Sequence, residues 1–377
     1  MLEAVELALQ ARFHTSPNPC VGALLVKEGK VVAKGFHKGA GQPHAEVEAL
    51  AHAREQGIDP SECSLVVTLE PCRHHGKTPP CTEAILNAGI RHVVIGAPDP
   101  NPEASGGADI LMSRGVRVDL GVGLEACLDL IDDFVVWKTR GLPYVLLKLA
   151  STLDGRIATR EGNSRWVTSA STRRRVHELR ARVQAIMVGG NTFYRDDPQL
   201  TCRLENTEEL CPRQPLAVIV SSRLPEAAKP MHLLKERPGD LLFWTSMASA
   251  ASTRAEDLKR NGAAVWGLPA LQNAATGYGM RSELDLSEGL RRLHTEYGCH
   301  YLLCEGGGRL GLSLLQNGLV GELHLHLAPK ILADNEATPL FNGLAPQQMD
   351  DGLQLRITQT RMSDEDLMLT LKPPRVY

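Results

Sequence analysis

The sequence has no long apolar run, few aromatic residues and no excess of charge of one sign. No apolar stretch approaches the roughly 20 residues that a membrane-spanning helix needs, so we expect a soluble protein without a membrane partner. Aromatic residues make up 4% of the chain and the net charge is -3. RNA-binding modules typically carry basic patches with interleaved aromatic residues, and we therefore expect no nucleic-acid partner.

The N-terminal segment and the cysteines indicate the cellular compartment in which we expect the protein. The segment MLEAVELALQAR carries acidic residues where a signal peptide carries basic ones, which predicts no export. Nine cysteines are an odd number scattered over a long chain, and this is not typical of a disulfide framework. We expect a cytoplasmic protein whose reduced thiols bind metal or pack in a core.

The alternation of strand and helix patterns predicts two α/β domains. At 377 residues the chain exceeds one average domain. Short apolar runs alternate with helical patterns as far as residue 121, and residues 123–138 have a helical pattern. The segment TRGLP then precedes a fresh strand pattern, YVLLKLA, so we place the domains at 1–140 and 141–377. The final pair of apolar runs, GLQLRIT and LMLTLK, predicts an antiparallel hairpin.

The segment TLEPCRHHGKTPPC, residues 68–81, predicts a zinc site. Catalytic zinc is held by three protein ligands, and Cys72 and Cys81 supply two thiolates. His44, in PHAEVEAL, is the candidate third ligand because Glu46 follows it in the pattern H-x-E, the signature of zinc nucleobase deaminases. Pro43 places His44 at a helix entrance, and two prolines place Cys81 at another, where helix amides favour a thiolate.

This constellation predicts hydrolytic deamination. Zinc activates water for attack on a ring carbon that bears an amine, and Glu46 would carry a proton to the departing ammonia. Eight residues rather than two separate Cys72 and Cys81, which departs from the general signature. The alternatives are two core thiols, or a closed structural zinc site with His74 or His75 as an extra ligand. Neither alternative explains the glutamate at position 46, because neither needs a group that transfers protons.

The first half resembles a known family. The segments PNPCVGALLV, GFHKGAGQPHAE and TLEPCRHHGKTPPC are similar to the deaminase half of the bifunctional riboflavin-biosynthesis deaminase/reductases, whose cysteines have this spacing. The resemblance implies a cytidine-deaminase-like α/β/α fold with one zinc ion per chain. It also implies a pocket for a phosphoribosyl pyrimidine lined by Asn18, His37, His74 and Lys77. Without it, Asn18 is equally well a turn residue between two prolines, and His37 is better interpreted as a surface histidine at a strand end.

The second half contains a glycine motif. The segment HYLLCEGGGRLGLSLL predicts a strand, a glycine turn and a helix whose first N–H groups can hold phosphate. Gly306, Gly308 and Gly311 match G-x-G-x-x-G, but late in the domain, where a plain tight turn explains them equally well. The segments LPYVLLKLASTLDGRIAT, GNSRWVTS, VGGNTFYRDDPQLTCR and CEGGGRLGLSLL resemble the reductase half of the same family. This implies a dihydrofolate-reductase-like α/β fold that uses NADPH.

The resemblance assigns further site residues by matching position. For NADPH it implies contacts from Ser151, Trp166, Thr192, Asp196, Ser222, Gly307, Gly308, Arg309, Leu310, Gly311, Leu312 and Ser313. For the reductase substrate it implies contacts from Lys148, Ser164, Thr168, Arg180, Leu200, Arg203 and Glu305. Arginine suits a phosphorylated sugar because its guanidinium group is a planar bidentate donor.

Simpler interpretations exist for some of these residues. Trp166 alone is equally well a core residue, and Asp196 is equally well part of an ordinary turn. We interpret Arg173–Arg175 as the solvated face of a helix. Ser221 departs from the family, which commonly has aspartate at this position.

Taken together, these patterns predict a bifunctional enzyme of riboflavin synthesis. It would deaminate 2,5-diamino-6-(5-phosphoribosylamino)pyrimidin-4(3H)-one and then use NADPH to form 5-amino-6-(5-phosphoribitylamino)uracil. We expect small-molecule substrates and a homo-oligomer. The rival interpretations are an enzyme active only as a deaminase, an RNA-binding deaminase-like module, and a non-catalytic scaffold stabilised by zinc.

Overall fold

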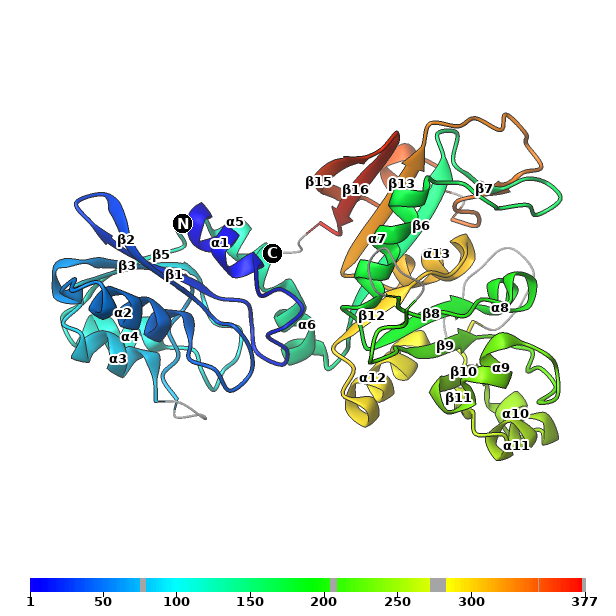
Figure 1. The fold of residues 1–377 in the computed structure, drawn as a ribbon, viewed down its shortest axis with the longest axis horizontal. Helices are drawn as coiled ribbons and strands as arrows, with labels where there is room; N and C mark the ends of the chain where they lie inside the picture. Colours follow the sequence, from blue (N-terminus) through cyan, green and yellow to red (C-terminus); the bar gives the residue numbers. More distant parts are fainter. Residues whose placement is uncertain (75–78, 204–208, 272–282, 345, 375–377) are drawn as a thin grey trace. The chain divides into compact units, whose positions relative to one another are not determined.

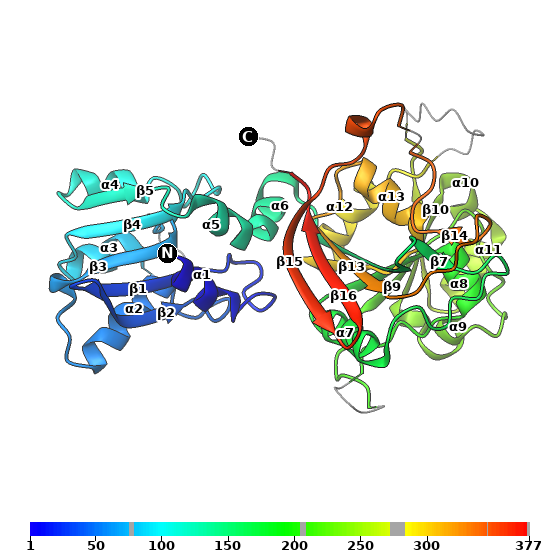
Figure 2. The same cartoon turned by 90° about the horizontal axis from the view of Figure 1, so that it is seen from above.

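The chain forms two units, each built on its own β-sheet. The computed structural model describes residues 1–74, 79–203, 209–271, 283–344 and 346–374. The units are Met1–Gly141 and Leu142–Tyr377 (Figures 1 and 2). None of the helices in the described ranges has both the length and the apolar character that crossing a bilayer requires.

The first unit has a five-stranded mixed sheet in the order β2-β1-β3-β4-β5. Strand β1 is antiparallel to both β2 and β3, whereas β3, β4 and β5 run parallel. Each strand coincides with an apolar run of the sequence. The bounds are β1 Gly22–Lys27, β2 Lys30–Phe36, β3 Ser64–Leu69, β4 His92–Ala97 and β5 Arg117–Leu120.

Helices cover both faces of this sheet, as an α/β/α fold requires. Helices α2, α3 and α4 pack on one face through a core that includes Leu50, Ile85 and Leu111. Helices α1 and α5 pack on the other face, where the close approach of α1 leaves no room for a Cβ at Gly22. The bounds are α1 Leu2–Leu9, α2 Ala45–Glu55, α3 Cys81–Asn87, α4 Gly107–Ser113, α5 Leu124–Leu130 and α6 Asp132–Arg140, with a 3-10 turn, η1, at Pro60–Glu62.

The second unit has a nine-stranded sheet in the order β11-β10-β9-β8-β12-β6-β13-β16-β15. The strands from β11 to β13 in this order run parallel to one another, and β16 pairs antiparallel with β13. Strands β16 and β15 form the predicted antiparallel hairpin. The bounds are β6 Tyr144–Thr152, β8 Ala185–Gly189, β9 Leu216–Val220, β10 Leu241–Ser246, β11 Ala264–Leu268, β12 Tyr301–Cys304, β13 Glu322–Ala328, β15 Arg356–Ser363 and β16 Asp366–Lys372. A second, two-stranded sheet joins β7 Arg156–Ala158 to β14 Thr338–Pro339.

Helices also cover both faces of the nine-stranded sheet. On one face, Gly289 of α12 packs against the ring of Trp244, and α13 packs against Leu147. On the other face, Phe193 of α8 packs against Phe243 with 5.6 Å between ring centroids. The helices are α7 Ala170–Arg180, α8 Gly190–Asp196, α9 His232–Glu236, α10 Met247–Ala250, α11 Thr253–Arg260, α12 Leu286–Tyr297 and α13 Gly308–Gln316, and the 3-10 turns are η2 Pro238–Asp240 and η3 Met349–Asp351. The prediction of an α/β architecture is therefore right for both halves.

Candidate active sites

The three candidate zinc ligands lie together near the carboxyl end of β3. His44 is the N-cap of α2, Cys81 is the first residue of α3, and Cys72 follows β3. Their ligand atoms all lie within 4.8 Å of one another. His44 Nδ1 is 3.1 Å from Cys81 Sγ and 3.6 Å from Cys72 Sγ. One imidazole and two thiols are a donor set that suits zinc, and three ligands are the number of a catalytic site.

The alternative of a closed structural zinc site gains no extra ligand from the part of the chain that the structure describes. His74 is exposed and is not a member of the ligand cluster. His75 lies outside the described residues.

The interaction between the two thiols shifts their pKa values in opposite directions. The thiol of Cys81 lowers the pKa of Cys72 to about 4, and the backbone N–H of Cys81 adds a bond of 3.4 Å to the same sulfur. The same pairing, together with burial, raises the pKa of Cys81. The hydrogen bond to Cys72 also raises the pKa of His44. Because zinc binds thiolate and neutral imidazole, metal binding at this cluster releases protons.

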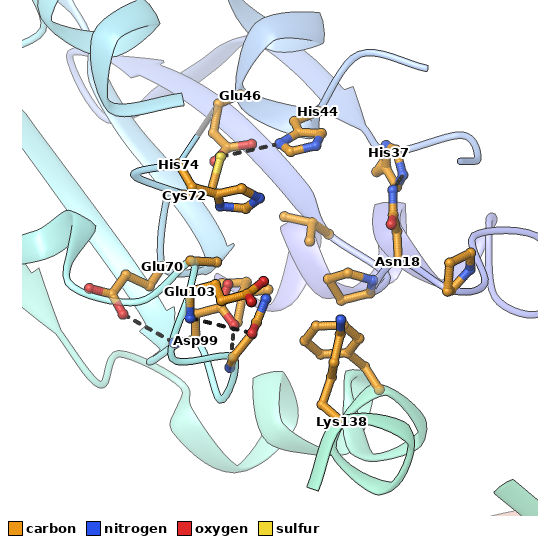
Figure 3. A pocket seen from close by; sticks show the side chains of 17 residues that line it. Asn18, His37, His44, Glu46, Glu70, Cys72, His74, Asp99, Glu103 and Lys138 are labelled. Carbon is orange, nitrogen blue, oxygen red and sulfur yellow. Dashed lines mark hydrogen bonds between the residues drawn. The ribbon is translucent and has the colours of Figure 1, made fainter. Parts of the chain in front are cut away.

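Glu46 lies in the first turn of α2, directly after the candidate ligand His44. Its side chain is 3% exposed, and it lines the same pocket as His44 and Cys72 (Figure 3). Burial raises the pKa of the Glu46 carboxyl group. A carboxyl group with a raised pKa holds a proton more readily than an exposed one, which suits a general acid and base.

The pocket beside these residues has a volume of about 220 Å³. One side is formed by Asn18 and His37, whose Nδ2 and Nε2 atoms lie 3.0 Å apart. The other ring nitrogen of His37 is 3.0 Å from the carbonyl oxygen of Pro43, so the imidazole is held from both ends. His37 is 2% exposed, and burial lowers its pKa. The interpretation of His37 as a surface histidine is therefore wrong.

Three acidic residues that line the pocket, Glu70, Asp99 and Glu103, were not predicted. The carboxylate of Glu70 accepts hydrogen bonds from the backbone N–H groups of Asp99, Gly106 and Ala108 at 3.1, 3.1 and 2.9 Å, and thereby fixes the start of α4. Burial, with a smaller contribution from Glu70, raises the pKa of Asp99 to about 6. Glu70 and Asp99 follow β3 and β4, which are adjacent parallel strands whose carboxyl ends meet at one edge of the sheet. This shared position is the sequence signal that could have identified them as pocket residues.

Helix α6 supplies two further pocket residues that no sequence pattern identified. Phe134 and Lys138 line the pocket one helical turn apart, with Lys138 Nζ 5.7 Å from the centre of the Phe134 ring. Figure 3 shows Lys138 across the pocket from Glu46 and His44. The exposed His74 also lines the pocket, whereas Lys77 lies outside the described residues.

In the second unit, four predicted NADPH positions follow neighbouring parallel strands. Ser151 lies near the end of β6, Thr192 lies in α8 after β8, Ser222 follows β9, and Gly307 follows β12. Strands β9, β8, β12 and β6 are adjacent in the sheet and parallel. Their carboxyl ends therefore meet at one edge, and the fold brings together segments that are far apart in the sequence.

The backbone of the glycine turn before α13 and of the start of this helix lies close to neighbouring segments of the chain. A Cβ on Gly308 would lie 1.7 Å from the carbonyl oxygen of Leu340, and a Cβ on Gly311 would lie 3.2 Å from Leu147. Gly307 is the N-cap of this helix and has no side chain with which to cap the first N–H groups. Such a helix start fits the pyrophosphate of NADPH. Of the other residues in this run, Arg309 is exposed, Leu310 and Ser313 are half-buried, and Leu312 is buried.

Ser221, the departure from the family pattern, stabilises the turn after β9. Its hydroxyl accepts a hydrogen bond from the Arg223 N–H at 3.2 Å and donates one to the Arg223 carbonyl at 2.7 Å. An aspartate side chain can accept the same N–H two residues on, so serine preserves this local turn.

The structure tests the simpler interpretations of Trp166, Asp196 and the arginine run. Trp166 is 60% exposed and stacks on Arg173, whose guanidinium carbon is 4.2 Å from the ring centroid, so the core interpretation is wrong. Arg174 is exposed, as the solvated-face interpretation predicts, whereas Arg173 and Arg175 are half-buried and Arg173 also donates to the Thr168 carbonyl at 2.7 Å. Asp196 is exposed at the end of α8, where Asp197 adopts φ 42° and turns the chain.

Arg180 and Glu305, two predicted substrate contacts, form a bidentate ion pair. Arg180 Nε and Nη2 donate to the two Glu305 carboxylate oxygens at 2.7 and 2.8 Å, and Nη1 donates to the Thr201 carbonyl at 2.8 Å. Lys148 lies on the adjacent strand β6. Burial lowers the pKa of its ammonium group, and the Glu305 carboxylate offsets part of this shift. The three predicted residues thus belong to one charged cluster, in which Arg180 holds Glu305 in place.

The remaining predicted substrate contacts lie in two loops. Ser164 is half-buried, and Thr168 is buried at the loop that leads into α7. Leu200 is 3% exposed and adopts φ 48°, in the left-handed region that is typical of turns. Arg203 Nη2 donates to Gln199 Oε1 at 2.6 Å, so its guanidinium group is tied to the same turn.

Comparisons with known proteins match both halves. Residues 1–97 match the cytidine and deoxycytidylate deaminase zinc-binding region, and residues 143–369 match the RibD C-terminal domain. The riboflavin biosynthesis protein RibD of Aquifex aeolicus is 37% identical over 98% of this chain and 96% of its own length. RibD of Escherichia coli is 36% identical over 98% of each chain.

Solved structures give the same result. A structure of Acinetobacter baumannii RibD is 34% identical, covers 99% of this chain and 98% of its own, and superposes with a TM-score of 0.73. The diaminohydroxyphosphoribosylaminopyrimidine deaminase/5-amino-6-(5-phosphoribosylamino)uracil reductase of Thermotoga maritima is 32% identical, covers 99% and 97%, and has a TM-score of 0.74. These matches confirm the predicted fold class, the deaminase and reductase activities, and zinc and NADPH as cofactors. With a deaminase half, a reductase half and relatives that align along nearly its whole length, the chain belongs to the RibD family of bifunctional riboflavin-biosynthesis enzymes.

Proposed function

We propose that residues 1–140 form the deaminase domain of this enzyme and residues 141–377 the reductase domain. The first acts on 2,5-diamino-6-(5-phosphoribosylamino)pyrimidin-4(3H)-one. The second converts 5-amino-6-(5-phosphoribosylamino)uracil into 5-amino-6-(5-phosphoribitylamino)uracil. The observation that carries this proposal is the buried carboxyl group of Glu46 beside His44 and Cys72 in one pocket.

In the deaminase domain, His44, Cys72 and Cys81 hold zinc, which supplies the Lewis acidity that activates water. Glu46 accepts a proton from the attacking water and returns it to the departing amino group. Its burial supports this role because a raised pKa lets the carboxyl group hold the proton between the two steps.

The rest of the pocket binds and orients the substrate. Asn18 and His37 support each other through their hydrogen bond and present fixed polar groups to the base. His74 contributes from the pocket rim, and Lys77, outside the described residues, is assigned here from the resemblance alone. We assign Lys138 to the substrate phosphate because it is a cation that lines the pocket across from the zinc ligands.

In the reductase domain, NADPH supplies a hydride for C1 of a ring-opened, imine-like form of the sugar. The cofactor contacts are the positions at the carboxyl edge of the sheet together with Trp166 and Asp196. Ser164, Thr168, Leu200 and Arg203 line the substrate side.

The charged cluster on and beside β6 faces the substrate. Lys148 approaches the sugar, and Glu305 orients that ammonium group while Arg180 fixes Glu305. The bidentate geometry supports this arrangement, since it defines the position of the carboxylate that faces Lys148.

We also propose that the enzyme is a cytoplasmic homo-oligomer. All nine cysteines are free thiols, which suits a reducing compartment. Strand β15 ends the nine-stranded sheet and carries exposed apolar side chains at Ile357 and Met362, as an edge used for association would. Sedimentation velocity of the full chain tests this: a single monomeric species at micromolar concentration would contradict association.

The experiment that tests the two-domain assignment starts from the pre-deaminated substrate. We expect the purified enzyme to oxidise NADPH when 5-amino-6-(5-phosphoribosylamino)uracil is the only substrate present. Chelation of zinc should stop deamination and leave this oxidation unchanged. If folded protein oxidises no NADPH, residues 141–377 do not form a working reductase and the deaminase-only interpretation is the better one.

A further inference from the structure

Two cysteines of the second unit lie in direct contact outside the zinc site. Cys202 Sγ and Cys211 Sγ are 2.7 Å apart. A disulfide bond is about 2.05 Å long, and unbonded sulfurs normally stay much farther apart than 2.7 Å, so little movement separates this contact from a covalent bond.

The backbone holds the two cysteines opposite each other. The Cys211 N–H donates to the Cys202 carbonyl at 3.0 Å, and Arg203 and Leu210 form an antiparallel bridge next to them. Gln214 binds the backbone of both cysteines: its Nε2 donates to the carbonyls of Cys202 and Cys211 at 2.9 and 2.8 Å. The amide oxygen of Gln214 accepts the Cys202 N–H at 2.8 Å. The sulfur contact is therefore held by hydrogen bonds of the backbone and of Gln214.

The residues on either side of Cys202 give the contact a consequence. Thr201, whose carbonyl accepts a hydrogen bond from Arg180, directly precedes Cys202. Arg203 directly follows it and is a proposed substrate contact. A covalent bond at Cys202 would thus fix the segment that connects the charged cluster to Arg203.

We propose that Cys202 and Cys211 form a reversible disulfide that fixes the Thr201–Arg203 segment of the reductase site. The oxidant is a small-molecule disulfide such as oxidised glutathione. The effect on the reductase rests on the proposed role of Arg203, whereas formation of the bond does not.

The exposure of the two thiols sets the order of the steps. Cys211 is partly exposed, whereas Cys202 is buried and burial raises its pKa to about 12. Cys211 therefore attacks the oxidant first, which forms a mixed disulfide and releases one small thiol. Cys202 then attacks the Cys211 sulfur and displaces the second thiol. Two protein thiols are oxidised, one small-molecule disulfide is reduced, and the two protons pass to the two released thiols.

Peptide mapping tests bond formation directly. Trypsin cleaves after Arg195, Arg203 and Arg213, which places the two cysteines on separate peptides, 196–203 and 204–213. The zinc-loaded full chain is equilibrated in glutathione buffers from fully reduced to fully oxidised, alkylated and digested. We expect these two peptides to appear as one disulfide-linked species in oxidising buffer and to separate after treatment with dithiothreitol. Absence of the linked species at every ratio would overturn the proposal.

Kinetics test the consequence for the reductase. We expect oxidation to lower KM for 5-amino-6-(5-phosphoribosylamino)uracil about threefold in the unmodified chain. The shift should be absent in both Cys211→Ser and Cys211→Ala, with deaminase activity as the check that each variant folds. A linked species with unchanged KM would overturn the effect on the segment, and a KM shift that persists in both variants would assign that shift to another thiol.

Discussion

The two active sites differ in how their residues are distributed along the chain. The zinc site draws its ligands and Glu46 from two short segments, 43–46 and 72–81, and the side chains themselves carry the chemistry. The reductase site draws on the ends of four strands that span residues 151–307, and much of it is backbone at turns and at a helix start. Chemistry carried by side chains leaves a readable pattern in the sequence, whereas a site made of strand ends depends on the sheet order.

This difference also predicts how each of the two activities responds to substitutions. One side-chain substitution should abolish deamination, because one group performs each step. Reduction should decline by degrees, because positioning is shared among many contacts.

The largest effect is expected from Glu46→Gln. The amide cannot transfer the proton, so deamination should fall by about 10³-fold while the zinc content and NADPH-dependent reduction stay unchanged. Steady-state assays of each half-reaction and metal analysis measure this. Glu48→Gln, in the same helical turn and paired with Lys38 at 2.8 Å, is the matched control. Loss of both activities in Glu46→Gln would refute the separation of the two sites.

Arg180→Gln should produce the next largest effect. It leaves Glu305 in the interior without its bidentate partner, which costs about 3 kcal/mol of unfolding free energy and should lower reductase kcat/KM about 100-fold. Denaturant unfolding and NADPH oxidation measure the two quantities. The exposed Arg174→Gln on the same helix should change neither, and a fully stable Arg180→Gln would contradict the structural role assigned to this pair.

Gly308→Ala should weaken cofactor binding. The new Cβ would lie 1.7 Å from the Leu340 carbonyl oxygen, so the helix start has to shift, at a cost of about 2 kcal/mol. We expect KM for NADPH to rise about tenfold with deamination unaffected. Gly239→Ala serves as the control because its Cβ meets no atom within 4 Å. An unchanged KM for NADPH would place the cofactor away from this turn.

Lys138→Met should separate phosphate binding from chemistry in the deaminase. Because Lys138 is exposed, we expect only about a fivefold rise in KM, with kcat unchanged and with the effect confined to the phosphorylated substrate. Lys138→Arg should retain most of the affinity because it keeps the charge. A similar rise in KM for the dephosphorylated compound would assign Lys138 to the base instead.

The smallest effect concerns Asp99 and pH. Its folded-state pKa is raised to about 6 from 3.8, so the folded chain holds this proton more tightly than the unfolded chain. The resulting stabilisation is present below about pH 4 and is lost as the pH rises through about 6. After allowance for partial exposure it amounts to about 1 kcal/mol. Asp99→Asn should flatten the pH dependence of unfolding in this interval, whereas the exposed Asp109→Asn should not.

Much of the fold was accessible from the sequence. The apolar runs that predicted strands became strands, including the C-terminal hairpin β15–β16, because a period of two or a short apolar run defines a strand locally. Pro43 and Pro80 correctly marked the starts of α2 and α3.

The pocket lining could be predicted only in part. Glu70, Asp99 and Lys138 enter the deaminase pocket from a strand end, a loop and a helix that are far apart in the sequence. No local pattern distinguishes Lys138 from any other surface lysine. Without the family resemblance, His37 would be taken for a surface histidine, because burial depends on what covers a strand end, and here Asn18 lies against it.

The sequence by itself determined the chemistry of the zinc site, since the identity and spacing of His44, Glu46, Cys72 and Cys81 specify ligands and a proton carrier. Only the tertiary structure decided which charges meet. It paired Arg180 with Glu305, placed Arg173 on Trp166 and brought Cys202 against Cys211. Ligand chemistry is a property of residue type, whereas ion pairs and sulfur contacts depend on distances that only the packed chain sets.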